Sequence, residues 1–273
     1  KKIGEIDFES EIIKQCITDR YSSEQSVYDV IYFSCWTQGD AALPNITDLG
    51  NFKFLRELSL PYMEVINWET LSDLDYLTTF RGTQLTDDEL NLLANKASIE
   101  NVDIRNSVFS DLSSLTLLTN LYSLQLYRTT VGDWQDLINI ELTNLSVQDT
   151  NFTDASLINA SVRFFDGSNT DITNLPLLSS LEQLNRLYLW GVNADDWSFL
   201  SSLTQLEALD VGDSNFTDLS FINSRNLTSL YLSYTQVTDW NSVNEFKSLE
   251  QFYARQTNFS DLSLLEGATL QTL

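Results

Sequence analysis

Histidine is absent from this sequence of 273 residues, and cysteine, methionine and proline are scarce. Without histidine the chain cannot form a Ser-His-Asp or Cys-His nucleophile arrangement, and it lacks the commonest protein ligand for metal ions. The sequence also contains no phosphate-binding glycine-rich loop, no H-E-x-x-H motif and no paired C-x-x-C zinc pattern. Two carboxylates would suffice for a glycosidase, but among 39 acidic residues chance proximity gives that option little weight. We therefore expect no enzymatic activity, no metal site and no cofactor.

Basic residues are few, because 15 lysines and arginines stand against 39 aspartates and glutamates, which gives a formal net charge of −24. A surface this negative repels phosphate backbones and anionic headgroups, so nucleic acids and membrane surfaces are poor partners. No run of about 18 apolar residues exists, so we expect no membrane insertion of this segment. Hydrophobic residues still make up 42% of the chain, which predicts a folded protein with a sizeable core.

A short phrase returns along most of the chain: an apolar residue, a small polar residue, Asp or Asn, and then Leu or Trp. Weaker copies begin at Leu85 and Phe152, and the Asp or Asn recurs every 19 to 24 residues. Such a period predicts a solenoid of stacked coils. The clear copies lie at residues 46–49, 65–68, 109–112, 131–134, 172–175, 194–197, 216–219, 237–240 and 259–262.

Between these phrases the apolar residues are spaced three and then two apart, as in Leu55, Leu58 and Leu60. The two-residue spacing is typical of β-strands, whose alternate side chains point to opposite faces. Each strand is only about three or four residues long and cannot bury its leucines alone. The pattern therefore predicts one short parallel strand per coil, with all coils sharing one continuous core.

Together, the L-x-x-L-x-L strand and the following (I/V/F)-(T/S)-D-L-S-x-L phrase resemble the bacterial leucine-rich repeats of the internalin type. The resemblance implies a curved, right-handed α/β solenoid with a parallel β-sheet on the concave face, short turns or 3-10 segments on the convex face, and an N-terminal helical cap. Where that family usually has Asn, this chain has a hydroxyl residue, which we expect to bond the buried turn backbone. These residues are Ser107, Thr129, Thr150, Thr170, Ser214, Thr235 and Thr257.

The N-terminal residues 7–20 have the pattern of a short amphipathic helix, with Asp7 as the expected N-cap and Phe8 and Ile17 on its apolar face. Bacterial repeat proteins of the kind that this chain resembles often begin with such a helix, which shields the first coil from water. We predict that residues 1–44 form this helical cap.

The two cysteines, Cys16 and Cys35, both lie in the expected cap. In a reducing cytosol they would be buried thiols. Their position in a terminal cap favours a Cys16–Cys35 disulfide, which the chain-entropy argument values at about 3 kcal/mol. We expect Cys35 and Trp36 to lie against the helix. A disulfide in turn favours an exported protein, secreted or at the bacterial cell surface.

The repeats are predicted to fill residues 45–273 as about ten full coils. The last residues, 270–273, have the pattern of the opening of another strand, so the solenoid has no C-terminal cap in this sequence. Because an uncapped apolar edge invites aggregation, we expect the sequence to be a fragment of a longer protein.

The recurring Asp has two interpretations. A ladder of carboxylates along the solenoid could bind Ca²⁺, or each Asp could cap a short helical turn by accepting from backbone N–H groups two or three residues later. The tolerance of Asn67 and Asn174 at this position favours capping. The tryptophans that follow it are expected to fill the core, and they are Trp68, Trp134, Trp197 and Trp240.

The residues between the strand leucines are expected to point outward on the concave face. Seven of the nine arginines lie in or beside these strands, together with several tyrosines. Arg, Tyr and Trp are enriched at binding hot spots. The alternative is that the aromatic residues only stabilise the sheet and that the arginines neutralise Asp103, Asp166 and Asp210. The candidate ligand-binding residues are Arg81, Arg105 and Tyr127 towards the cap, and Arg186, Tyr188, Trp190, Asp210, Tyr231, Tyr253 and Arg255 in the C-terminal half.

The sequence therefore favours a recognition module of an exported bacterial protein, which binds a protein or peptide partner, such as a cell-surface receptor, on its concave face. One alternative is a carbohydrate-binding adhesin domain, in which Trp190, Tyr231 and Tyr253 stack on sugar rings. The other is a passive spacer between domains. Solenoids of one geometry bind unrelated ligands, so the repeat pattern alone does not name the partner.

Overall fold

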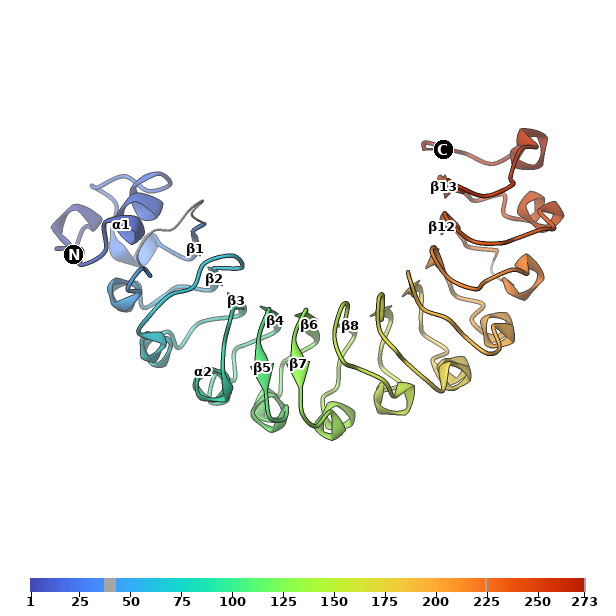
Figure 1. Ribbon diagram of the computed structural model, residues 1–273. Helices are drawn as coiled ribbons and strands as arrows, with labels where there is room; N and C mark the ends of the chain where they lie inside the picture. Colours follow the sequence, from blue (N-terminus) through green and yellow to red (C-terminus); the bar gives the residue numbers. More distant parts are fainter. Residues whose placement is uncertain (37–42, 224, 273) are drawn as a thin grey trace. The chain divides into compact units, whose positions relative to one another are not determined.

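The computed structural model describes residues 1–36, 43–223 and 225–272, and these residues form two compact units, Lys1–Ile140 and Glu141–Leu273. We call them the N-terminal unit and the C-terminal unit and describe each by itself. In both, one short strand per coil alternates with a short helix, which is a 3-10 helix in most coils (Figure 1). The expected boundary at residue 44 falls next to residues 37–42, which lie outside the described part, as does Leu273.

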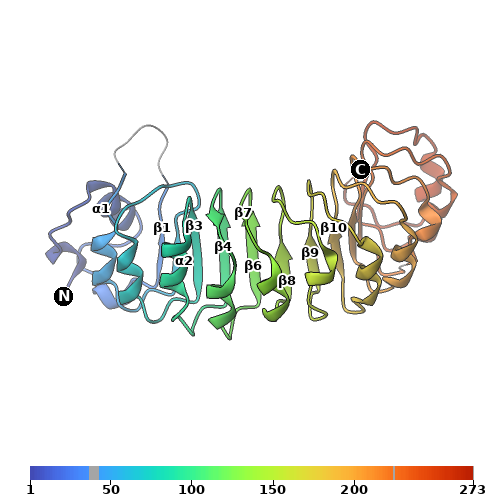
Figure 2. The ribbon, with the colours of Figure 1, turned by 60° about the horizontal axis from the view of Figure 1, so that its bottom comes forward.

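The N-terminal unit contains a parallel sheet whose strands follow one another in chain order (Figure 2). Its sheet strands are β1 (Tyr32–Ser34), β2 (Glu57–Ser59), β3 (Thr79–Thr83), β4 (Asn101–Arg105) and β6 (Ser123–Tyr127). A second pairing joins β5 (Val108–Phe109) to β7 (Thr130–Val131). Its helices are η1 (Ile3–Glu5), α1 (Glu11–Thr18), η2 (Val27–Asp29), η3 (Thr47–Asn51), η4 (Trp68–Asp73), α2 (Asp87–Leu93), η5 (Ser113–Leu117) and η6 (Gln135–Asn139).

The C-terminal unit repeats this plan with greater regularity, again with parallel strands paired in chain order. The strands are β8 (Asn144–Ser146), β9 (Phe164–Asp166), β10 (Arg186–Tyr188), β11 (Ala208–Asp210), β12 (Ser229–Tyr231) and β13 (Gln251–Tyr253). The 3-10 helices are η7 (Ala155–Leu157), η8 (Leu175–Ser180), η9 (Ser198–Ser202), η10 (Leu219–Phe221), η11 (Asn241–Glu245) and η12 (Leu262–Leu265). The parallel sheet and the 3-10 segments confirm the predicted leucine-rich-repeat solenoid.

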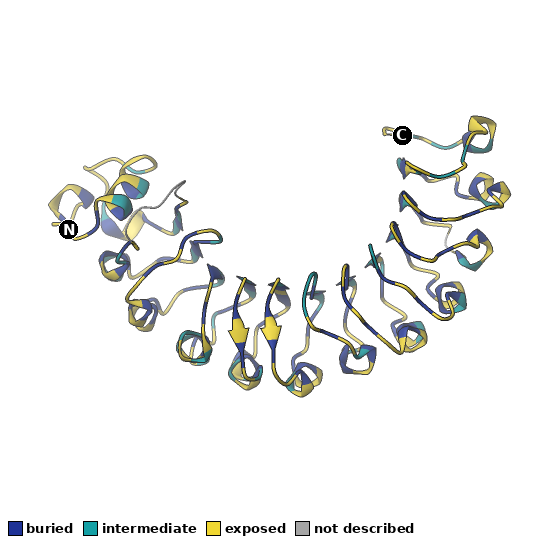
Figure 3. Ribbon diagram, in the orientation of Figure 1, coloured by how far each residue is buried: buried dark blue, intermediate teal, exposed yellow. Residues whose placement is uncertain are grey.

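The core of each coil lies between its strand and its 3-10 helix, where the repeated leucines are fully buried (Figure 3). Phe165, Leu187 and Leu209, the central residues of β9, β10 and β11, have no exposed surface. The repeated tryptophans are also buried, as predicted, with 6–9% of their surface exposed. The indole nitrogens of Trp197 and Trp240 donate to asparagine side chains of the next coil, so these large residues are buried without an unsatisfied polar atom.

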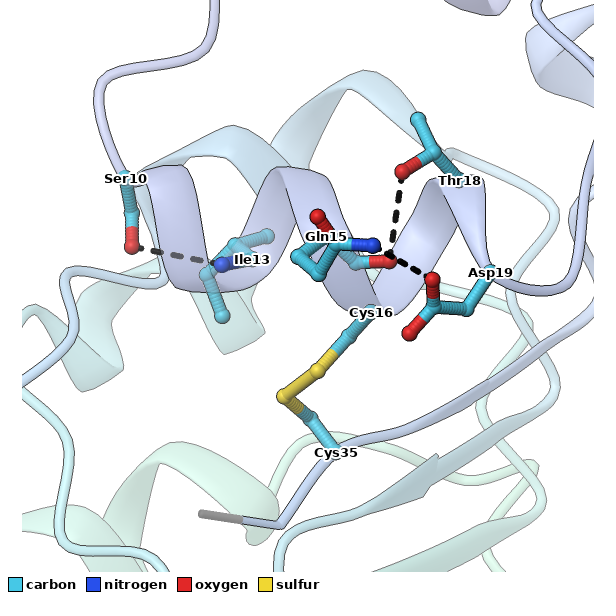
Figure 4. The surroundings of a disulfide bond; sticks show 7 residues. All are labelled: Ser10, Ile13, Gln15, Cys16, Thr18, Asp19 and Cys35. Carbon is cyan, nitrogen blue, oxygen red and sulfur yellow. Dashed lines mark hydrogen bonds between the residues drawn. A yellow bond between two sulfur atoms is a disulfide. The ribbon is translucent and has the colours of Figure 1, made fainter.

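The cap differs from the prediction at the start of its helix. Helix α1 begins at Glu11 rather than after Asp7, and Ser10 is its N-cap, accepting from the Ile13 N–H at 3.3 Å (Figure 4). The reason lies in the first coil, where the buried Asp48 carboxylate accepts from the backbone N–H groups of Glu9 and Ser10 at 3.2 and 3.0 Å. These bonds hold the preceding segment out of the helix.

The disulfide between Cys16 and Cys35 is present, as predicted (Figure 4). Cys35 is buried and its backbone N–H donates to the Ser59 carbonyl, which ties the bridge to β2. The expectation that Trp36 packs on the helix is wrong, because its side chain is 64% exposed. The strand β1, which lies within the expected cap, pairs with β2, so the cap contributes the first strand of the sheet.

The hydroxyl ladder bonds the turn backbone as predicted. In the C-terminal unit, Thr150, Thr170, Ser214, Thr235 and Thr257 each donate to the carbonyl three residues earlier, at 2.6–2.7 Å. The hydroxyls of Thr150, Ser214 and Thr257 also accept from the backbone N–H two residues later. A single hydroxyl therefore satisfies a donor and an acceptor of its own turn.

Removing one ladder hydroxyl should destabilise the fold. Ser214→Ala leaves the Val211 carbonyl and the Phe216 N–H without this partner in a buried turn, so we expect the free energy of unfolding to fall by about 1–3 kcal/mol. Ser201→Ala is the matched control, since the exposed Ser201 hydroxyl also donates three residues back, and its effect should stay within about 0.5 kcal/mol. Urea denaturation of both variants measures the difference, and equal effects would contradict a structural ladder.

In most coils the recurring Asp caps the start of the 3-10 helix, as the second interpretation predicted, whereas Asp48 and Asp87 accept from backbone N–H groups of distant residues. In seven coils the carboxylate accepts from the backbone N–H two residues later, at 2.8–3.0 Å. Asn67 and Asn174 do not support the prediction, because both adopt the left-handed conformation and make no cap hydrogen bond. Asn tolerates that backbone conformation better than most residues, which explains its presence there. No group of three or more metal-ligating side chains occurs within the described ranges.

Candidate recognition surface on the C-terminal strand face

The outward side chains of β8–β13 form three rows across the sheet, because the parallel register aligns equivalent residues of neighbouring coils. In each strand the central residue points into the core and its two neighbours point outward. The first row begins before the central residue and includes Phe164 and Arg186. The middle row follows the central residue and consists of Ser146, Asp166, Tyr188, Asp210, Tyr231 and Tyr253. The third row lies two residues further along the chain and includes Trp190 and Arg255.

Aromatic rings cover much of the middle row. Tyr231 and Tyr253 stack with ring centroids 5.1 Å apart and an interplanar angle of 12°. Tyr188 meets Phe164 of the preceding strand edge to face, at 5.4 Å. These rings are half-buried against one another, and Tyr253 remains 38% exposed. The row therefore presents a preorganised aromatic surface with little side-chain entropy left to lose on binding.

Trp190 lies beside this row in the turn that follows β10, and the local backbone is built around it. A Cβ atom added to Gly212 in the next coil would lie 2.3 Å from the indole ring, so only glycine lets the indole lie there. The ring reaches on to Tyr234, which it meets edge to face at 5.9 Å. Tyr234 has a φ of 63°, a conformation uncommon for a bulky residue, at a turn position that holds Gly191 and Asp213 in the two preceding coils.

The two arginines predicted for this face, Arg186 and Arg255, are exposed. Neither guanidinium forms an ion pair or a hydrogen bond with any of the described residues. The backbone of Arg255 is fixed, because its N–H donates to the Ser233 hydroxyl and its carbonyl accepts from the Tyr234 N–H. Both charged groups are therefore available to a ligand without breaking an internal bond.

The two aspartates of the middle row, Asp166 and Asp210, are half-buried and lie on either side of Tyr188. Each accepts from the backbone N–H two residues later, that of Ser168 at 3.0 Å and that of Gly212 at 2.9 Å. Burial raises the pKa of Asp210 to about 6, and the nearby negative charge of Asp166 adds to the effect. Burial also raises the pKa of Asp166. Charge at these positions therefore costs free energy in the unbound protein.

The sequence-based suggestion that arginines neutralise these aspartates holds only for Asp103. In the N-terminal unit, Arg105 binds Asp103 through two hydrogen bonds of 2.9 and 3.0 Å, and Arg81 pairs with Glu57 at 2.6 Å. Tyr127 lies against the guanidinium groups of Arg105 and Arg128. The arginines of the predicted cap-side patch are thus engaged within their own unit, which makes the C-terminal patch the stronger candidate surface.

Two residues of this surface, Asp166 and Tyr234, lie in or beside the strands in the sequence pattern but were not among the predicted candidate residues. Asp166 lies at the repeat position of Asp210, so the spacing from the strand leucines could have identified it. Tyr234 follows the strand by three positions, and its contact with Trp190 of a coil two turns away leaves no signal in the local pattern.

No protein-family model and no curated protein sequence matches the chain. Among solved structures, an internalin, InlF, of Listeria monocytogenes is similar, with 25% identity, a TM-score of 0.69, and coverage of 83% of this chain and 69% of that one. A leucine-rich-repeat protein of Leptospira interrogans is 19% identical with a TM-score of 0.66, over 90% of this chain and 72% of that one. A plant peptide hormone receptor, RGFR1, solved in complex with RGF2, is 16% identical with a TM-score of 0.51, over 82% of this chain and 40% of that one.

The helices and the repeat architecture bear on the same question. In the part of the chain that the structure describes, no helix is both long and apolar enough to cross a membrane. The repeat phrase, the parallel strands, the 3-10 turns and the similarity to bacterial structures all agree. In its fold, the chain is an internalin-like leucine-rich-repeat protein.

Proposed function

We propose that the chain is a non-catalytic recognition module that binds a protein or peptide partner on the strand face of its C-terminal unit. The observation that carries the proposal is the combination of two arginines with the aromatic surface of the middle row. Among the described residues, neither Arg186 nor Arg255 has an ion pair or a hydrogen bond to its guanidinium group. In a chain with a net charge of −24, arginines left unpaired on one face are available for a ligand. Arg, Tyr and Trp are also the residues that most often dominate binding energy.

The fold of the similar structures supports a recognition role. The plant peptide hormone receptor among them is solved in complex with RGF2, so a solenoid of this kind can present a surface to a partner. The Cys16–Cys35 disulfide fits an oxidising compartment, and the internalin similarity fits a bacterial surface or secreted protein. Both observations support our proposal that the module acts outside the cell, where it meets a partner in solution or on another surface.

A peptide-display selection tests the proposed face. The whole immobilised chain is used to select binders from a random peptide library. The affinities of the selected peptides are then measured for the wild type and for two double variants. In the first variant, Tyr253→Ser/Arg255→Ser removes two exposed side chains of the candidate surface. We expect at least a tenfold loss of affinity, because hot-spot residues typically contribute about 2 kcal/mol or more.

The matched control replaces exposed aromatic residues elsewhere, Tyr28→Ser/Tyr76→Ser in the N-terminal unit, and should keep the wild-type affinity. Selected peptides that bind all three proteins equally would refute the strand face as the site. A glycan array with the same proteins separates the carbohydrate alternative, since sugar binding that disappears with Tyr253→Ser/Arg255→Ser would identify a glycan ligand. If the chain binds neither peptides nor glycans, a passive spacer between domains is the remaining function.

A further inference from the structure

The N-terminal unit contains an arginine site that the chain fills by itself. Asp103, in the middle of β4, binds the Arg105 guanidinium through both carboxylate oxygens, at 3.0 Å from Nε and 2.9 Å from Nη2. The third guanidinium nitrogen, Nη1, donates to the Tyr62 hydroxyl at 2.9 Å, and the guanidinium carbon lies 5.3 Å from the Tyr62 ring centre. A bidentate carboxylate beside an aromatic ring is the geometry that guanidinium groups prefer.

Asp210 occupies the same repeat position in the C-terminal unit, between the second and third apolar residues of its strand. In the Asp103 site the guanidinium belongs to Arg105, two positions after the aspartate. Two positions after Asp210 the chain has Gly212, which has no side chain at all. The Asp210 Oδ1 atom accepts from the Gly212 N–H, and the Oδ2 atom has no hydrogen-bond partner among the described residues.

The surroundings of Asp210 provide the aromatic part of the same arrangement. Tyr188 and Tyr231 flank it on the neighbouring strands. The Trp190 indole lies against Gly212, in the place of the missing side chain. Asp166 lies one strand beyond Tyr188 and adds negative charge. Aromatic faces and carboxylates both attract cations, and the nearest basic residue on these strands, Arg186, makes no ion pair with Asp210.

We infer that Asp210 receives an arginine side chain of the partner, with the guanidinium held by the carboxylate and flanked by Trp190, Tyr188 and Tyr231. The inference rests on the proposed recognition function and names the chemistry of its ligand. An arginine fits better than a lysine, because the internal example at Asp103 uses a fork of two parallel N–H bonds that an ammonium group cannot make. The half-buried charge of Asp210, which is costly in the free protein, then gains its partner on binding.

The test uses four short peptides, acetyl-Gly-Ser-X-Ser-Gly-amide, in which X is arginine, lysine, citrulline or glutamine. Binding to the full isotope-labelled chain is followed by NMR at the backbone amide of Gly212, which donates directly to Asp210. We expect saturable shifts with arginine, weaker binding with lysine, and no binding with citrulline, which keeps the shape of arginine but lacks its charge. Asp210→Asn should weaken arginine binding at least tenfold, while the charge-matched control Asp239→Asn should leave it within about twofold.

The pH dependence of arginine binding gives a second readout. On the strands next to Asp210 the ionisable groups are Arg186, Tyr188 and Tyr231. Asp166 and Tyr253 lie one strand further away on either side. Burial raises the pKa of Asp210 to about 6, so this carboxyl gains a proton between pH 7.5 and 5, and arginine binding should weaken over that range in the wild type. Equal binding of citrulline and arginine, or unchanged affinity of Asp210→Asn, would overturn the inference. The recognition function would survive that result if library-selected peptides still required Tyr253 and Arg255.

Discussion

Replacing Asp210 by asparagine is expected to make the unbound protein more stable at neutral pH. The folded chain raises the pKa of this carboxyl from 3.8 to about 6, so the folded state holds the proton more tightly than the unfolded chain does. The free energy of unfolding therefore falls as the pH rises between these two values. Asparagine does not ionise and can still accept from the Gly212 N–H. At pH 7.5 the variant should be more stable by up to about 3 kcal/mol, and near pH 4 the gain should vanish.

A substitution with the opposite expected effect on the free energy of unfolding provides the control. The backbone hydrogen bond from Ser156 lowers the pKa of Asp154, so its charge stabilises the folded chain above the unfolded pKa, and that contribution is lost as the pH falls through the lowered value. Asp154→Asn should consequently destabilise the protein at pH 7.5. Urea denaturation of the three proteins from pH 4 to 7.5 measures both effects. An Asp210→Asn variant no more stable than the wild type at pH 7.5 would contradict the cost that we assign to this charge.

Removing the Cys16–Cys35 disulfide is expected to lower the free energy of unfolding by about 3 kcal/mol. The bridge closes a loop with a sequence separation of 19, and the chain-entropy relation gives roughly that value for a loop of this length. The double variant Cys16→Ser/Cys35→Ser should show the loss in urea denaturation without reductant. Fluorescence of the cap and hydrogen exchange of helix α1 should both report earlier opening of this region.

Reductant supplies the matched comparison for the disulfide. Dithiothreitol should bring the wild-type protein down to the stability of the double variant and leave the variant itself unchanged. The two hydrogen bonds that Asp48 accepts from the segment before α1 remain in every case, so the cap should stay folded in the absence of denaturant. A loss below about 1 kcal/mol would mean that the cap hardly contributes to the cooperative stability of its unit.

The fold was predictable from the sequence because its determinants are local and repeated. The spacing of Leu184, Leu187 and Leu189 places their side chains in the core, and Asp218 caps the 3-10 helix η10 by accepting from the Ser220 N–H, two residues later. The same is true of the ladder hydroxyl of Thr170, which bonds within its own turn. These two hydrogen bonds join residues two and three positions apart, and the repetition of the pattern makes each feature visible.

The errors concern residues whose conformation is decided by a distant partner or by the backbone alone. The helix start depends on Asp48, which is about 40 residues away from the segment that it holds. Asn67 and Asn174 share the position of the capping aspartates but adopt the left-handed conformation. Asparagine can adopt this conformation, but its presence in the sequence does not show that it does. Trp36 is exposed next to residues 37–42, which lie outside the described part.

The candidate surface was predicted in part. Counting from the strand leucines correctly placed Tyr188, Asp210 and Tyr253 in one outward row. The distinction between paired and unpaired charges could not be obtained in this way, because it depends on which side chains meet across coils. Arg105 and Arg255 occupy the same repeat position, yet only Arg105 has an aspartate two residues before it to bind.

The hydroxyl ladder also bears on how such a chain can change its length. In the C-terminal unit each of the five ladder hydroxyls satisfies its own turn, so a coil can be duplicated or deleted as a cassette without leaving a turn carbonyl unpaired. The exception is the stretch from Trp190 to Tyr234, where one indole joins three successive coils through Gly212. We therefore expect the gain or loss of a coil to be tolerated more readily outside this stretch than inside it, and the stretch expected to resist such rearrangement overlaps the candidate binding surface.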